Sequence, residues 1–219
     1  MPPEDALSAR RGRAEAETSP AERVMFFSDA VVAIAITLLA IDLPVPQTTN
    51  STTNGQLLRE LGSDWPAYLA FIISFYVIAN HWSRHRRVFQ HVQSVNSTVN
   101  SLMLAWLLMM ILIPFSARLL ASDGAFGVRF TIYALIQVIA VLCQLRASRE
   151  LHRAGLLRPD APKAGTQRDF MVDVIFIAAF LLSIPVSFAT KWAFAVWAAA
   201  PLGARVLQAV RVFRTASST

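Results

Sequence analysis

The chain has 219 residues, of which 55% are hydrophobic and only 16% are charged, and its mean hydropathy is +0.47. A water-soluble fold cannot hide this much apolar surface, so the composition excludes an ordinary globular domain. The net charge is +6, but the basic residues lie at the ends of apolar segments, where they would meet lipid headgroups. The positive charge therefore does not indicate a nucleic-acid-binding protein.

Apolar segments of roughly 20 residues, long enough to cross a hydrocarbon core of about 30 Å, follow a polar N-terminal stretch. The first is too long for a signal peptide and carries Asp29 and Asp42, so we expect it to be retained. The sequence predicts an all-α integral membrane protein with six spans, at 24–44, 65–84, 98–117, 126–146, 170–189 and 192–212. We expect three regions: a disordered cytoplasmic tail at 1–21, a transmembrane domain at 22–213 and a short tail at 214–219.

The basic residues are unevenly distributed between the two sides that these spans define. Sixteen of the 20 Lys and Arg residues fall on the side of the N-terminal tail, which includes the strongly basic connection 146–169. Cytoplasmic loops of membrane proteins carry an excess of Lys and Arg. The sequence therefore predicts that both termini are cytoplasmic.

The first span contains the most unusual polar residue, Asp29. An ionised group at membrane depth costs about 3 kcal/mol or more, so it should face protein or water and have a partner. Two interpretations stay open: Ser28 and Asp29 satisfy backbone groups in the first turns of the helix, or Asp29 belongs to a functional site. Asp42 lies closer to solvent, just before Pro44, and we expect a structural role for it.

Further along the same span, Ile34, Leu38 and Ile41 recur at i, i+4 and i+7 and form one stripe, with Thr37 at its border. Such a stripe faces lipid or the protein core in most membrane helices. Periodicity alone does not separate these two environments from a pore.

A second cluster of polar and aromatic residues closes the second span. His81 and His85 are four residues apart, as metal ligands on a helix would be, but no H-E-x-x-H pattern or further Cys/His cluster accompanies them, so we expect no metal site. Two interpretations stay open for Trp82 and His85. In the first, both side chains hydrogen-bond to Ser28 and Asp29 on the first helix. In the second, Trp82 is an interfacial residue beside a basic anchor.

Catalytic and nucleotide-binding motifs are missing from the sequence. There is no G-x-S-x-G, Walker A or G-x-G-x-x-G pattern, and no potassium filter of the T-V-G-Y-G type. We expect neither an enzyme nor a cofactor, and a channel built from this chain would select ions in another way.

Three segments nevertheless form recognisable patterns, and together they resemble the lysosomal and bacterial potassium channels of the transmembrane protein 175 family. The R-x-x-x-F-S-D signature is matched without substitution at Arg23, Phe27, Ser28 and Asp29. The second and third segments are the pattern Trp82, His85, Phe89 and the run from Asn100 to Pro114, Phe115 and Ser116. The resemblance covers roughly residues 22–213.

The resemblance implies a homotetramer in which four copies of the first helix surround a pore that conducts K⁺ and other monovalent cations. It places Ile34 at the narrowest ring, followed by Leu38 and Ile41, with Thr37 near the path. It also implies a set of residues that brace the pore helix, namely Phe27, Ser28, Asp29, Trp82 and His85, with Arg23 as a candidate member.

The predicted function is thus a potassium-permeable cation channel with weak selectivity for K⁺ over Na⁺. Its rivals are a proton- or ion-coupled transporter that uses Asp29 and His85, and a membrane scaffold or intramembrane enzyme. Transporters usually have broken helices at mid-membrane, whereas the proposed pore helix is uninterrupted from Arg23 to Leu43. A single six-helix unit fits a prokaryotic plasma membrane better than a lysosome, with the lipid bilayer and monovalent cations as partners and no nucleic acid.

Overall fold

The structure is a computed structural model, which describes residues 20–41, 43–161, 165–190, 193 and 196–197. Within these ranges every named element is a helix, which confirms the expected all-α architecture. The helices are α2 (Pro20–Ile41), α3 (Asn54–Ser63), α4 (Trp65–Phe89), α5 (Ser97–Ala121), α6 (Phe126–Arg153) and α7 (Gly165–Ala189).

Helices α2, α5, α6 and α7 are each long and apolar enough to cross a membrane, and α3 with α4 forms a further candidate span that is bent by 56°. These helices correspond to five of the predicted spans, although α4, α5 and α6 continue for several residues beyond the predicted ends. The sixth predicted span, 192–212, falls almost wholly outside the described residues, as do the C-terminal tail at 214–219 and residues 1–19 of the N-terminal tail predicted at 1–21. The last two residues of that tail, Pro20 and Ala21, belong to α2.

The ends of α2 and α5 follow from local sequence. Helix α2 begins at Pro20, a residue that suits a first helical turn, and it ends at Ile41, shortly before Pro44. Helix α5 begins after Asn96, whose side-chain Oδ1 accepts a 2.8 Å hydrogen bond from the backbone N–H of Val99. Such a cap satisfies a backbone donor that would otherwise lack a partner.

The sequence analysis predicted no helix between the spans at 24–44 and 65–84, and here the structure differs. Residues Asn54–Ser63 form α3 because Thr53 and Gln56 make a capping box. Thr53 Oγ1 accepts from the N–H of Gln56 at 3.3 Å, and Gln56 Oε1 accepts from the N–H of Thr53 at 2.8 Å. This reciprocal pair is a recognised helix start, and it outweighs the Thr- and Asn-rich composition of the segment.

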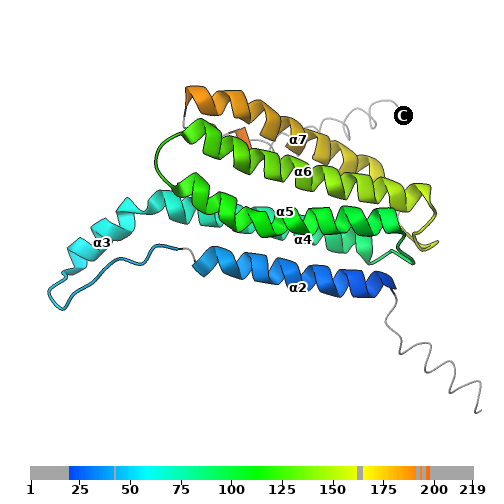
Figure 1. The fold of residues 1–219 in the computed structure, drawn as a ribbon, viewed down its shortest axis with the longest axis horizontal. Coiled ribbons are helices and arrows are strands. Elements are labelled where there is room, and N and C mark those ends of the chain that lie inside the picture. Colours follow the sequence, from blue (N-terminus) through cyan, green and yellow to red (C-terminus); the bar gives the residue numbers. More distant parts are fainter. Residues whose placement is uncertain (1–19, 42, 162–164, 191–192, 194–195, 198–219) are drawn as a thin grey trace, which may run out of the picture.

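Helix α2 lies along one side of the bundle and α7 along the other (Figure 1). Helix α2 contacts α4 and α5, whereas α7 packs mainly on α6. Helices α4 and α6 finish at the same end, where Arg86, Arg87 and Arg153 lie in their last turns. The loops beyond them are joined by a backbone bridge between Val92 and Leu157. We call this end of the bundle the basic end.

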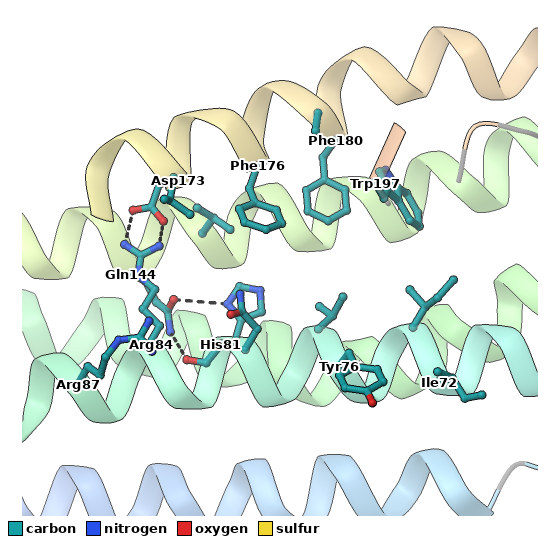
Figure 2. A pocket seen from close by; sticks show the side chains of 16 residues that line it. Ile72, Tyr76, His81, Arg84, Arg87, Gln144, Asp173, Phe176, Phe180 and Trp197 are labelled. Atoms are coloured by element: carbon teal, nitrogen blue, oxygen red, sulfur yellow. Dashed lines mark hydrogen bonds and ion pairs between the residues drawn. The ribbon is translucent and has the colours of Figure 1, made fainter. Parts of the chain in front are cut away.

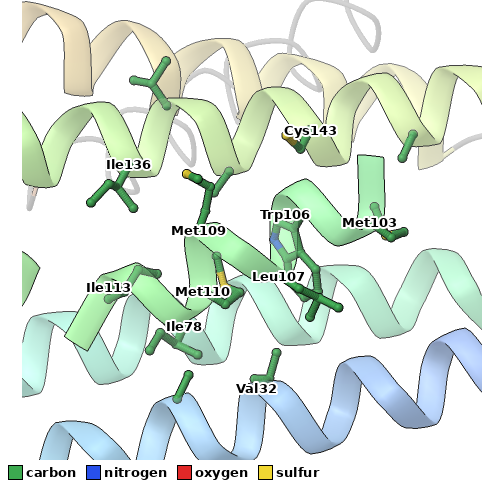
Figure 3. Close-up of a cluster of buried hydrophobic side chains, with 14 of the residues drawn as sticks. Val32, Ile78, Met103, Trp106, Leu107, Met109, Met110, Ile113, Ile136 and Cys143 are labelled. Atoms are coloured by element: carbon green, nitrogen blue, oxygen red, sulfur yellow. The ribbon is translucent and has the colours of Figure 1, made fainter. Parts of the chain in front are cut away.

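The apolar core is centred on α5 (Figure 3). Met103, Trp106 and Met110 of that helix are fully buried, together with Val32 of α2 and Ile78 of α4. Lipid tails are as apolar as these side chains, so the helices associate by close packing and not by the hydrophobic effect. Only one face of α2 takes part in this packing.

Candidate functional site

Helix α2 has two faces that differ sharply in burial. Ser28, Val32, Ala35 and Leu39 are buried against α4 and α5. The opposite face carries large apolar side chains that are exposed, namely Phe27 (54%), Ile34 (59%), Leu38 (40%) and Ile41 (74%). The predicted stripe of Ile34, Leu38 and Ile41 therefore does not face the core of its own subunit.

Thr37 lies on the same exposed face as this stripe. Its Oγ1 donates a 2.8 Å hydrogen bond to the backbone carbonyl of Ile34, so the hydroxyl is satisfied inside the helix. The face is consequently almost free of unpaired polar groups and is suited to contact lipid, another copy of α2 or a dewetted pore.

Phe27 belongs to this face by spacing as well as by exposure. It precedes Ile34 by seven residues, which is nearly two full helical turns. The sequence analysis grouped Phe27 with the bracing residues and did not place it on the stripe. The seven-residue spacing was the signal that would have done so.

Asp29 is held by a residue of the neighbouring helix. Trp82 Nε1 of α4 donates a hydrogen bond of 2.8 Å to Asp29 Oδ1, and both side chains are partly buried. The guanidinium of Arg86 lies over the Trp82 ring, 5.5 Å from its centroid. Of the two interpretations of Trp82, the hydrogen bond to the first helix is thus the one observed. The contribution of Arg86 was not anticipated.

His85 does not make the hydrogen bond that the sequence analysis considered for it. Its ring is buried and stacks on Trp106 of α5, with 4.7 Å between centroids and 18° between planes, and it also contacts Phe89 at 4.2 Å. Within the described part of the chain neither ring nitrogen has a hydrogen-bond partner. His85 therefore contributes an aromatic contact between α4 and α5.

The other residues of the signature occupy different environments. Ser28 is fully buried, and its Oγ donates a 2.7 Å hydrogen bond to the carbonyl of Val24 within α2. Arg23 is exposed and makes no hydrogen bond or ion pair with another described residue. Asp42 lies outside the described residues.

A second polar cluster, which the sequence analysis missed, joins α4 to α6 (Figure 2). His81 Nδ1 lies 3.4 Å from Gln144 Oε1, and His81 Nε2 lies 3.3 Å from Gln137 Oε1. Gln144 Nε2 also donates to the His81 carbonyl at 3.1 Å. The signal was that Tyr133, Gln137 and Gln144 recur at i, i+4 and i+11 on one face of an apolar helix.

His81 and His85 thus contact different partners. Among the described residues no group of three or more His, Cys, Asp or Glu side chains is placed to hold a metal ion. One further polar contact ties α4 to α7, an ion pair between Arg84 and the buried Asp173.

The family model described as endosomal/lysosomal potassium channel TMEM175 matches residues 23–114, which contain most of α2, all of α3 and α4, and most of α5. A potassium channel of Streptomyces collinus is 37% identical over 153 residues, which are 67% of this chain and 73% of that protein. The mouse endosomal/lysosomal proton channel TMEM175 is 36% identical over 86 residues, which are 37% of this chain but only 17% of the mouse protein.

Solved structures give the same result for the fold. The crystal structure of a lysosomal potassium-selective channel TMEM175 homolog from Chamaesiphon minutus superposes with a TM-score of 0.66 at 26% identity. The superposition covers 87% of this chain and 97% of that one. The chain therefore belongs to the family of the endosomal/lysosomal potassium channel TMEM175.

Proposed function

We propose that this chain forms a potassium-permeable cation channel, in which four copies of α2 surround a central pore. The observation that carries the proposal is the exposed stripe of Phe27, Ile34, Leu38 and Ile41 on a helix whose other face packs on its own subunit. The names of the bacterial relatives support potassium as the permeant ion. No cofactor is required for this activity.

The position of α2 in the bundle suits this role. It forms one side of the subunit, away from α7, so four subunits can meet through α2 while the other helices face outward (Figure 1). Ala30, Ala33 and Ala40 are also exposed on α2 and flank the stripe. Small residues let the backbones of neighbouring helices approach closely, which favours a tight helix ring.

The mechanism is a hydrophobic constriction. Four Ile34 side chains that meet at the axis exclude water and ions by dewetting, and a small rotation or dilation of α2 admits them. Leu38 and Ile41 continue this apolar path, and Thr37 lies beside it. A passage without fixed ion-binding groups favours K⁺ over Na⁺ only weakly, because selection rests on the lower cost of dehydrating K⁺.

The contacts behind α2 hold the stripe in place. The hydrogen bond from Trp82 to Asp29 fixes α2 against α4, and the stack of His85 on Trp106 fixes α4 against α5. Ser28 is buried at the same level and keeps its hydrogen bond within α2. These residues act on the pore through the position of α2 and do not touch the ions.

The basic end of the bundle faces the cytoplasm in this proposal, because the excess of Lys and Arg lies there. The membrane is the plasma membrane of a prokaryotic cell, as suggested by the bacterial relatives. The bilayer and monovalent cations are then the partners of the tetramer.

The experiment that tests the proposal is current measurement on the purified protein in a planar bilayer, with K⁺ on one side and Na⁺ on the other. We expect unitary steps that reverse toward the K⁺ potential, and a higher conductance for Ile34→Asn because a polar ring wets the constriction. Ile111→Asn is the matched control, since Ile111 is 50% exposed but lies on α5, and its conductance should equal that of the wild type.

Two outcomes would contradict the proposal. If the assembled Ile34→Asn protein conducts like the wild type, Ile34 is not the constriction. If the wild type carries no current but supports slow, saturable uptake into liposomes, the chain is a transporter, and Asp29 and His85 become the residues to test.

A further inference from the structure

A groove of about 430 Å³ lies between α4, α6 and α7, on the side of α4 that faces away from α2 (Figure 2). This volume falls within the range of about 300–1,000 Å³ that is typical of small-molecule sites. Apolar side chains make most of its walls, among them Ile72, Val77, Val141, Phe176, Ala179 and Phe180. The channel function proposed above makes no use of this groove.

The groove is apolar along most of its length and polar at one end. Ile72 and Tyr76 line one end, whereas Asn80, Arg84 and Arg87 line the other, because α4 runs toward the basic end of the bundle. From Ile72 to Arg87 the helix rises by roughly 22 Å. This exceeds half of a hydrocarbon core of about 30 Å, so the groove is long enough for an extended chain from one leaflet.

The charge at the polar end favours an anion. Asp173 is buried and pairs with Arg84, so these two charges compensate each other. Arg87 is exposed, and among the described residues it has no acidic partner. The groove-lining residues therefore leave one net positive charge, at the depth where a lipid would carry its headgroup.

We propose that the groove binds an acyl chain of an anionic glycerophospholipid from the leaflet at the basic end, with the lipid phosphate on Arg87. An arginine guanidinium matches a phosphate through paired, charge-assisted hydrogen bonds. A free phosphate would leave the apolar length of the groove unfilled, and a neutral lipid would leave Arg87 without a counter-ion. The proposal is independent of ion conduction.

The test uses the full-length protein in vesicles that contain phosphatidylglycerol with a photoreactive diazirine on its acyl chain. After irradiation, mass spectrometry of peptides should place adducts on the groove walls, near Val77 and Phe176. Ala179→Trp fills the groove and should lower these adducts about tenfold. Ala178→Trp is the matched control, because Ala178 is exposed but does not line the groove, and its adducts should be unchanged.

The headgroup contact is tested separately. Arg87→Gln should lower the preference for phosphatidylglycerol over phosphatidylcholine about fivefold, the effect expected for one interfacial arginine. Arg158→Gln is the control, since Arg158 is exposed near the basic end but outside the groove, and it should leave the preference unchanged. If Ala179→Trp does not fold, Ala179→Leu replaces it.

Two results would overturn the proposal. Adducts that persist in Ala179→Trp, or that spread evenly over all exposed helix faces, would show that lipid does not occupy the groove. Efficient disulfide crosslinking of Ala179→Cys to a cysteine placed in 198–219, or to a second copy of the chain, would show that protein fills it instead.

Discussion

Trp82 and Asp29 join α4 to the exposed helix α2 through a single hydrogen bond of 2.8 Å between the indole Nε1 and the carboxylate Oδ1. Asp29 lies five residues before Ile34, a rise of about 7.5 Å along the helix. The contact fixes the rotation of α2 close to the proposed constriction, and thereby decides which side chains the helix presents away from its subunit.

The first prediction concerns this contact. Trp82→Phe keeps an aromatic ring but removes the donor, which leaves the partly buried carboxylate of Asp29 without its hydrogen bond. Hydrogen bonds to charged groups contribute about 1.5–3 kcal/mol, so the thermal unfolding midpoint of the purified protein should fall clearly. Differential scanning calorimetry would measure it.

Trp65→Phe serves as the control for this change, because Trp65 is 60% exposed and its loss should leave the midpoint near that of the wild type. Asp29→Ala should impair assembly of the oligomer, seen as a shift in size-exclusion chromatography. If Asp29→Ala assembles normally and Trp82→Phe melts like the wild type, the bracing role of this pair must be abandoned.

The second prediction tests which face of α2 lines the pore. The single cysteine, Cys143, is buried, so Cys143→Ser gives a background for introduced cysteines. Phe27→Cys, Ile34→Cys and Leu38→Cys should react with a charged methanethiosulfonate reagent and change the current. Leu39→Cys, on the buried face, should not react.

The reaction rates should follow the helical period, because residues seven apart share a face. Equal rates at all four positions, or a reactive Leu39→Cys beside an unreactive Ile34→Cys, would mean that a different face of α2 meets the permeation path. The extent of labelling is measured from the loss of free thiol, so the experiment works even if the channel carries no current.

The fold and part of this site could be predicted from the sequence, and particular residues show which features could not. Long apolar segments and clustered arginines were enough to predict the membrane helices. Bilayer thickness sets the length of a span and headgroup charge favours basic residues at its ends, and both features can be recognised within one segment. The stripe of Ile34, Leu38 and Ile41 was visible as a period. Its exposure was not, since that depends on which face α4 and α5 cover.

Contacts between helices were the part that the sequence could not supply. The stack of His85 on Trp106 joins residues whose spacing contains no signal. The sequence analysis therefore considered only a hydrogen bond to the first helix or an interfacial anchor at this position. The partners of His81 were missed for the same reason, although the polar period of Gln137 and Gln144 on α6 pointed to a buried face. Helix α3 was overlooked because composition was weighed above its capping box.

The third prediction follows from the contacts of His85. Both ring nitrogens lack partners in the described structure, so the aromatic stack is the feature that should matter for stability. His85→Phe keeps the stack and should change the free energy of unfolding little. His85→Ala leaves a cavity between α4 and α5 and should cost about 3 kcal/mol or more.

Thermal or urea unfolding of the two variants in the same detergent would measure the difference. Gln90→Ala, just beyond α4, is an exposed control for handling effects. If His85→Phe is as destabilising as His85→Ala, the ring nitrogens contribute and the stacking account is wrong.

The fourth prediction concerns the ion pair between Arg84 and Asp173, which ties α4 to α7. Asp173→Asn removes the charge that compensates Arg84, and breaking a buried pair on one side typically costs about 3–5 kcal/mol. The unfolding midpoint of Asp173→Asn should therefore fall by more than that of Trp82→Phe.

The double variant Arg84→Met with Asp173→Leu removes both charges and should recover most of the loss, since a well-packed apolar pair can match a buried ion pair. Additive losses in the double variant would mean that Arg84 and Asp173 stabilise the bundle through separate contacts, and the ion pair would then not be what holds α7 to α4.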